Sequence, residues 1–273
     1  MSITIFPKRV MLFTNARDEK NIKEWAAHHL LIGFDLIVIF DHKSKERISQ
    51  EFINFDERIK VYRCEVEGPV KMKLMMNAVN IAKEYNVDWL LYLDADEFLI
   101  LNSFKGVKHM LSYYSHADSV AINWLLFGSN HHIKEPEGLI LENYTKSDLI
   151  LDKHVKTFVR PDKVLNANNP HFYVMKDKTK MYNIFNQVMN SPFYWNDIEL
   201  LYVNSPAYIA HYVYQSEETY VNRKVNLPRD DTSTFREKDE NIHTKNNEII
   251  NEDPKNKYSE NLKQFLEFKK LGY

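Results

Sequence analysis

Short apolar runs alternate with helical patterns over the first hundred residues. Residues 10–14, 36–40 and 89–93 are nearly uninterrupted apolar runs with the length of strands buried on both faces. Residues 22–30 and 72–85 instead repeat apolar side chains at helical spacing. This alternation predicts an α/β fold with a mostly parallel central sheet flanked by helices.

The pattern becomes less regular in the second half of the chain. Residues 120–125 predict a strand, and residues 139–215 mix short aromatic strands with turns, which indicates a smaller β region. From about residue 226 the chain is polar and charged until a last helical stretch around Leu262. We therefore expect a domain at residues 1–225, followed by a polar linker and a C-terminal helical tail at residues 226–273.

The charge balance and the cysteine count disfavour several classes of protein. Lysine and arginine total 36 against 38 for aspartate and glutamate, so the net charge of -2 gives no support for a nucleic-acid partner. The single Cys64 has no companion for a disulfide or a zinc site. No segment approaches the roughly 18 apolar residues of a membrane span, and residues 1–9 lack the apolar run of a signal peptide. These features predict a cytoplasmic protein without a transmembrane segment.

The clearest chemical signal is Asp94-Ala95-Asp96, which directly follows the apolar run at residues 89–93. Ligands of open α/β sheets bind outside the carboxyl ends of the strands, so Arg17, Asp41 and Asp94 should converge there. Two carboxylates at this spacing suit Mn²⁺ or Mg²⁺, which usually completes its ligand shell with substrate phosphate oxygens. The same tripeptide also occurs in solvated turns. The buried strand before it favours a binding site.

Several stretches, in this order, resemble glycosyltransferases of the family-2-like and family-92-like group, formerly a domain of unknown function with a GT-A fold. The resemblance covers roughly residues 10 to 225. Its motifs are Asn15-Ala16-Arg17-Asp18-Glu19, Glu24-Trp25, residues 28–35, 41–44, 88–89, 93–99, 124–129 and 156–161, His211-Tyr212, Ser216 and Lys224. Asn130 departs from the family pattern, because a small residue, often glycine, is expected before His131.

The resemblance implies a GT-A-type, Rossmann-like sheet with a smaller β region on the acceptor side. It also implies a nucleotide-sugar donor, with UDP-sugars as the first candidates, and a metal that bridges the DxD motif and the diphosphate. The implied nucleotide-sugar residues are Arg17, Glu19, Asp41, Asp94, Lys156 and Lys224, with Arg160 as a further cation, and the implied metal ligands are Asp94, Asp96 and His211.

Each of these assignments has a simpler structural alternative. The charged residues 17–19 also suit the N-terminus of a helix, where the helix dipole favours acidic side chains. His211 follows an apolar stretch, so it could equally be a hydrogen-bonded structural histidine. Exposed basic residues such as Lys224 often belong to a solvated face.

The acceptor side is less defined by the sequence. The resemblance suggests inversion, for which His131, Glu135 and Asp152 are candidate general bases, with His131 preferred because its loop matches the family. Trp124, Phe127 and the pair Tyr194-Trp195 either stack on a sugar or belong to the core. The expected acceptor is a hydroxyl of a glycan, a lipid-linked sugar or a protein.

Two other functional classes fit part of the pattern. Metal-dependent phosphohydrolases and nucleotidyltransferases also place carboxylates at strand ends to bind Mg²⁺. A catalytically inactive module that binds sugar nucleotides would retain the same fold. Neither the P-loop GxxxxGK[ST] nor the dinucleotide motif GxGxxG occurs in the chain, which disfavours ATPases and dinucleotide oxidoreductases.

Overall fold

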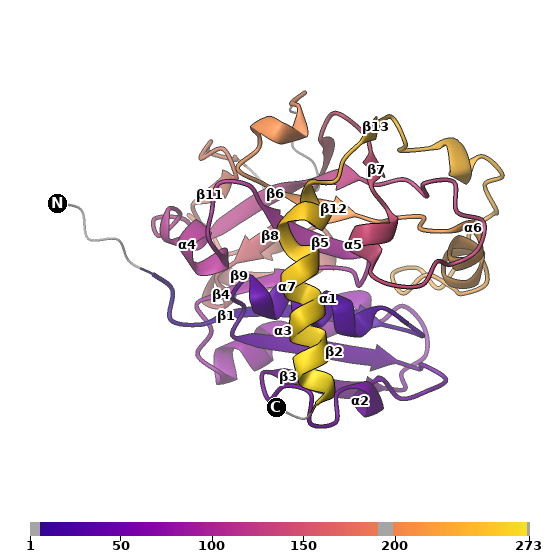
Figure 1. Cartoon of the computed structure of the whole chain (residues 1–273). Coiled ribbons are helices and arrows are strands. Elements are labelled where there is room, and N and C mark those ends of the chain that lie inside the picture. Colours follow the sequence, from indigo (N-terminus) through magenta and orange to yellow (C-terminus); the bar gives the residue numbers. More distant parts are fainter. Residues whose placement is uncertain (1–5, 191–198, 272–273) are drawn as a thin grey trace.

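The computed structural model describes residues 6–190 and 199–271, which form a central sheet with helices on both faces (Figure 1). The described helices are α1 (Ile22–Leu31), α2 (Ile48–Glu51), α3 (Lys71–Glu84), α4 (Val107–Ser112), α5 (Ile140–Asn143), α6 (Glu217–Tyr220) and α7 (Asp253–Lys270). The described strands are β1 (Val10–Ala16), β2 (Leu36–His42), β3 (Ile59–Cys64), β4 (Trp89–Tyr92), β5 (Glu97–Leu101), β6 (Ser119–Leu126), β7 (Lys146–Ser147), β8 (Asp152–Val159), β9 (Val164–Asn169), β10 (Phe172–Met175), β11 (Met181–Asn183), β12 (Ala207–His211) and β13 (Ile249–Ile250).

The main sheet has the strand order β3-β2-β1-β4-β8-β6-β12-β5, with β11 also paired to β6. β1 is parallel to both β2 and β4, and β2 is parallel to β3. β8 is antiparallel to β4 and β6, and β5 is antiparallel to β12. The predicted α/β class and mostly parallel sheet are therefore confirmed, and the antiparallel strands lie in the half formed after residue 93.

Alternation along the strands divides the core into two layers. Leu12 and Ile37 face the cluster that contains Trp25 of α1, whereas Phe13 packs in the opposite cluster with Met75 of α3. This is the two-sided burial that the uninterrupted apolar runs predicted, because successive side chains of a strand point to opposite faces. α1 and α3 thereby hold the carboxyl ends of β1, β2 and β4 in register.

A short connection forces the sheet to curl. Four strand spacings separate β4 from β5, roughly 19 Å at 4.8 Å per spacing. Only residues 93–96 join the two strands, and the backbone N–H of Glu97 donates to the carbonyl of Asp94 at 3.0 Å in a tight turn. The far half of the sheet must therefore bend back toward β4. This bend brings the end of β12 beside the DxD motif, where the N–H of Tyr212 donates to the carbonyl of Asp96 at 2.9 Å.

The chain beyond residue 225 contacts the sheet domain in several places. α7 packs on α1 and α5 (Figure 1), and the backbone N–H of Leu101 donates to the Tyr258 hydroxyl at 3.0 Å. β13 pairs with β7. The division at residue 225 stays a prediction.

Within the described ranges, no helix combines the length and apolarity that crossing a bilayer requires.

Glu24 of α1 is buried, and both of its carboxyl oxygens accept backbone N–H groups at the start of α5, from Ile140 at 2.8 Å and Leu141 at 3.2 Å. Burial raises the pKa of Glu24 from 4.5 to about 8, in spite of these hydrogen bonds. Between these pH values the folded state holds a proton that the unfolded chain has released. Stability therefore falls as pH rises through this window, by up to about 1.4 kcal/mol per pH unit.

We expect Glu24→Gln to remove the pH-dependent contribution of Glu24 to the free energy of unfolding, because glutamine stays neutral at every pH. Urea unfolding of the native chain and the variant, at several pH values between 4.5 and about 8, measures this contribution. The stability of the native chain relative to the variant should decline as pH rises. Parallel pH profiles for the two proteins would contradict the assignment.

Candidate active site

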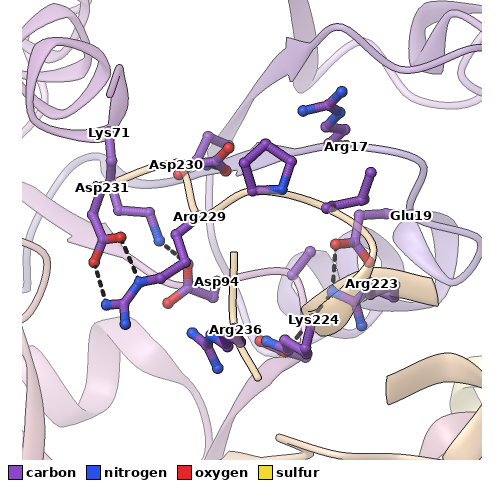
Figure 2. Close-up of a pocket in the computed structure, with 15 residues that line it drawn as sticks. Arg17, Glu19, Lys71, Asp94, Arg223, Lys224, Arg229, Asp230, Asp231 and Arg236 are labelled. Atoms are coloured by element: carbon purple, nitrogen blue, oxygen red, sulfur yellow. Dashed lines mark hydrogen bonds and ion pairs between the residues drawn. The ribbon is translucent and has the colours of Figure 1, made fainter. Parts of the chain in front are cut away.

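Asp94 and Asp96 follow β4 and line a cavity of about 120 Å³, which we call the DxD cavity (Figure 2). Its walls come from four segments: the end of β1 and the loop after it, the start of α3, the DxD turn, and residues 223–236. Its basic lining residues are Arg17, Lys71, Arg223, Lys224, Arg229 and Arg236, and its acidic ones are Glu19, Asp94, Asp96, Asp230 and Asp231. Six cations therefore face five carboxylates.

Asp94 is held by two lysines. The ammonium of Lys71 donates to Oδ1 and that of Lys156 to Oδ2, both at 2.8 Å, and the Tyr92 hydroxyl also donates to Oδ1. Burial raises the pKa of Asp94, but Lys156 and then Lys71 lower it more, so that it lies well below its ordinary value. Asp94 is therefore a carboxylate under all ordinary conditions.

Asp96 is fully buried and has one satisfied and one unsatisfied oxygen. Lys224 donates to Oδ2 at 2.6 Å, and Arg223 Nη2 lies 3.8 Å from the same oxygen. Oδ1 has no hydrogen-bond partner in the described part of the chain, and His211 Nε2 lies 3.7 Å away from it. Burial raises the pKa of Asp96, but Lys224, His211 and Arg223 together lower it below its ordinary value.

Lys156 and Glu97 form the buried floor beneath the two aspartates. The side chain of Lys156 is 1% exposed, and its ammonium lies 3.3 Å from Glu97 Oε2 and 4.3 Å from the centre of the Tyr92 ring. Glu97 Oε2 accepts the backbone N–H of Asp94 at 2.9 Å. Burial raises the pKa of Glu97 to about 8, although Lys156 opposes the shift. This floor links the DxD turn to β8 by charge and by hydrogen bonds.

A second ion pair closes the opposite wall. Arg223 donates to Glu19 through Nη2, and burial raises the pKa of Glu19 even though Arg223 lowers it. The guanidinium groups of Arg17 and Arg236 have no hydrogen-bond or ion-pair partner among residues 6–190 and 199–271. These two cations are the ones still available to a phosphate group.

Residues 227–231 form part of the lining of the DxD cavity. The Asp230 carboxylate accepts from Asn15 Nδ2 and lies 3.1 Å from His42 Nδ1. Its backbone carbonyl accepts the N–H groups of Val70 and Lys71, at the start of α3. A segment expected to be a linker therefore contributes to the cavity wall. Its polar composition gave no sign of this, because the contacts join residues that are far apart in the sequence, by 215 positions for Asn15 and by 188 for His42.

The structure brings most of the proposed donor-site residues together. Arg17, Glu19, Asp94, Asp96 and Lys224 line the DxD cavity, and Lys156 and His211 contact its aspartates. Sequence reasoning missed Lys71, Glu97, Arg223, Arg229 and Arg236. Of these, Glu97 follows the DxD motif directly and Arg223 precedes Lys224, so proximity in sequence was the available signal.

Asp41 does not line the DxD cavity, although Arg17 and Asp94 do. It is 1% exposed and accepts hydrogen bonds from the backbone N–H groups of Ser44 and Ile48, both at 3.1 Å. Arg63 Nη1 also lies 3.0 Å from each of its oxygens. The expected convergence of three strand ends is thus found for two, because Asp41 turns inward and stabilises the loop after β2. Its role toward a base or ribose stays a prediction.

The three candidate general bases of the acceptor side lie outside the DxD cavity. His131 is exposed and has a positive φ of 63°, as has Asn130 with 50°. Asparagine tolerates this left-handed conformation better than most residues, so Asn130 fits a backbone position where the resemblance predicts a small residue, often glycine. Asp152 accepts from the backbone N–H of His154 at 2.8 Å and does not line the DxD cavity. Glu135 lines a neighbouring cavity.

Trp124 of β6 lies among histidine rings beside the DxD turn. Its ring centre is 4.3 Å from that of His211, 4.9 Å from His171 and 5.2 Å from His154. Phe127 is instead a core residue in contact with Tyr212. The pair Tyr194-Trp195 lies outside the described residues. Trp124 therefore remains the aromatic candidate near the carboxylates.

The donor atoms around Asp96 suit a divalent cation. Asp96 Oδ1 is a buried carboxylate oxygen without a hydrogen-bond partner in the described part of the chain, and it faces an imidazole nitrogen of His211. Burial lowers the pKa of His211 to about 4, so the ring is neutral, as a metal ligand must be. Both oxygens of Asp94 contact lysines instead. No group of three acidic, histidine or cysteine side chains within the described residues is already arranged around a metal position.

Comparisons with known proteins assign no family. No protein-family model matches the chain, and no curated protein matches it. Among solved structures, HddC from Yersinia pseudotuberculosis is similar at 8% identity and a TM-score of 0.38, covering 66% of this chain and 91% of HddC. UDP-glucose pyrophosphorylase in complex with UDP-glucose is similar at 10% identity and a TM-score of 0.32, covering 56% of this chain and 76% of that protein.

Proposed function

We propose that this protein is a metal-dependent glycosyltransferase with a GT-A-type fold. It transfers a sugar from a nucleotide-sugar, a UDP-sugar in the first instance, to a hydroxyl acceptor with inversion. The observation that supports this is the DxD cavity itself, which places Asp94 and Asp96 at the carboxyl end of β4 together with six cations, of which Arg17 and Arg236 remain unpaired in the described part of the chain. Such a site suits a diphosphate, whose negative charges need both cations and a carboxylate-bound metal.

The cations of the DxD cavity would stabilise the negative charge of the leaving group. When the bond between the anomeric carbon and the diphosphate oxygen breaks, negative charge grows on the terminal phosphate. Cations held in place before the reaction stabilise this charge without reorganising. Arg17 and Arg236 bind the phosphates in our proposal, and Lys224 moves between Asp96 and the leaving group.

Asp96 and His211, with Asp94 beside them, would hold a Mn²⁺ or Mg²⁺ ion, which supplies Lewis-acid stabilisation of the diphosphate when bound. Lys156 keeps Asp94 ionised and oriented from below. The buried Glu97 in turn orients the DxD backbone through the N–H of Asp94. These contacts preorganise both aspartates before any ligand arrives.

Inversion requires a general base on the acceptor side. Of the three candidates, Glu135 lines the cavity next to the DxD cavity, whereas His131 and Asp152 line neither of the two. The Glu135 carboxyl group forms an ion pair with Lys20. Glu135 therefore replaces His131 as the preferred general base in the proposal.

The first test is thermal unfolding with UDP-sugars and GDP-sugars, with and without Mn²⁺, for the native chain and Asp96→Ala. We expect one nucleotide class to raise the melting temperature of the native chain only with Mn²⁺, and this shift to vanish in Asp96→Ala. Bound ligand stabilises in proportion to the logarithm of its excess over Kd, so a saturating ligand gives a measurable shift.

Other results would favour the competing functions. Stabilisation by UTP together with a sugar 1-phosphate, with release of pyrophosphate, would establish a nucleotidyltransferase instead. Release of phosphate from simple esters would identify a phosphohydrolase. Binding of a nucleotide-sugar without turnover on any acceptor would indicate the inactive binding module. A folded native chain that responds to no nucleotide would contradict the proposal.

A further inference from the structure

A second cavity, of about 420 Å³, adjoins the DxD cavity. We call it the amide cavity. The two share Glu19, Ala95, Arg223 and Leu227 as a common wall, so a ligand in the amide cavity lies directly against the DxD turn. Its volume falls in the range of about 300–1,000 Å³ that is usual for small-molecule sites, which the DxD cavity alone does not reach.

The charged groups that line the amide cavity are mostly neutralised by one another. Glu19 pairs with Arg223, and Lys20 pairs with Glu135. Asp18 accepts the backbone N–H of Lys45 at 2.7 Å. Three acidic and three basic residues line the amide cavity, so its charges balance, and Arg17 and Arg236, the unpaired cations proposed for phosphate, line only the DxD cavity.

Its uncharged polar groups are instead left open to a ligand. Gln215 is 2% exposed, and its side-chain amide makes no hydrogen bond to any residue that the structure describes. The carboxamides of Asn21, Asn222 and Asn226 also line the cavity without a hydrogen-bond partner in the described ranges. Of the four, only Gln215 is buried, whereas Asn21 is partly exposed and Asn222 and Asn226 are exposed. A buried amide without a partner is costly, so Gln215 points to a ligand that completes its hydrogen bonds.

We propose that the amide cavity binds a neutral, hydroxyl-rich glycosyl unit. Each carboxamide has both a donor and an acceptor, as each sugar hydroxyl does, so the two groups match without any charge. Ala95, Ile140 and Leu227 add apolar surface for the carbon face of a sugar ring. The inference rests on the proposed function, because the common wall places this unit next to the diphosphate. The unit belongs either to the donor sugar or to the acceptor.

Saturation-transfer NMR with free methyl glycosides of glucose, galactose, mannose and N-acetylglucosamine tests the cavity without any nucleotide. We expect at least one glycoside to bind the native chain and to bind roughly tenfold more weakly to Asn222→Ala, which loses hydrogen bonds to the ligand. Gln215→Leu should have a similar effect. Asn222 is exposed, so its variant remains informative where the buried Gln215 variant fails to fold. Asn261→Ala changes an exposed carboxamide of α7 that lines a separate groove; it is the matched control and should bind the glycoside normally.

Calorimetry with UDP and UDP-glucose then separates the two sources of the glycosyl unit. Weaker binding of UDP-glucose but not of UDP to Asn222→Ala assigns the cavity to the donor sugar. Unchanged binding of both, with weaker glycoside binding, assigns it to the acceptor. Glycoside binding without any nucleotide binding would support the sugar site in the amide cavity but contradict the proposed glycosyltransferase function. No glycoside binding to the native chain, or equal binding to all variants, would overturn the inference.

Discussion

Lys156→Met is expected to lower the free energy of unfolding by about 3–5 kcal/mol, because it removes one partner of a buried ion-pair network. The Lys156 side chain is 1% exposed, and its ammonium contacts the carboxyl groups of both Asp94 and Glu97. Methionine fills similar space but leaves Asp94 with Lys71 and the Tyr92 hydroxyl, and it removes the lysine beside Glu97. Urea unfolding of the native and variant chains measures the loss.

A matched control and a double variant sharpen this test. Lys73→Met changes an exposed lysine of α3 and should alter stability by less than about 0.5 kcal/mol. Lys156→Met combined with Asp94→Asn removes both charges of one pair, so it should be more stable than the sum of the two single losses predicts. Strict additivity, or a loss in Lys156→Met as small as that of the control, would contradict the role of the buried lysine.

Asp96→Asn is expected to lower kcat/KM by roughly 100- to 1,000-fold, the usual effect of removing one preorganised electrostatic group. The substitution keeps the size of the side chain but removes the charge that Lys224 contacts, and it weakens the proposed metal site with His211. Turnover is measured with the nucleotide-sugar that stabilises the native chain, over a range of Mn²⁺ concentrations.

The control for this prediction is Asp162→Asn, at an exposed position of the short helical turn Pro161–Lys163 that lies outside both cavities. Its activity should remain within about twofold of the native value, as for most surface substitutions. Thermal unfolding of Asp96→Asn shows whether the protein is still folded under the assay conditions. A folded Asp96→Asn enzyme with nearly native turnover would exclude Asp96 from the reaction.

Much of the first half of the fold could be predicted from local patterns. The runs at residues 10–14, 36–40 and 89–93 form parts of β1, β2 and β4, and the helical spacing at residues 72–85 forms α3. These segments are predictable because burial on both faces leaves a continuous apolar run. The order of β8, β6, β12 and β5 was not predictable, because it depends on pairing between distant segments whose short, mixed patterns fit several registers.

The proposed donor site was predictable only in part, from the residues that directly follow the strands. Asp94 and Asp96 follow an apolar strand, and topology places them near Arg17. The same rule failed to place Asp41 in the cavity, because backbone N–H groups nearby bind its carboxylate instead. A strand-end rule gives the edge of the sheet but not the direction in which each side chain points.

The sequence by itself determined the α/β class, the buried strand before residue 94 and the two carboxylates after it, because these features depend on neighbouring residues. Only the tertiary structure decided which groups meet those carboxylates. Lys224 reaches Asp96 across 128 positions, and Lys156 reaches Asp94 across 62. The pairing of β12 with β5, in which His211 stands opposite Glu97, brings His211 to the same turn. Contacts at such separations arise from strand order and chain reversal, which no local pattern of apolar and polar residues encodes.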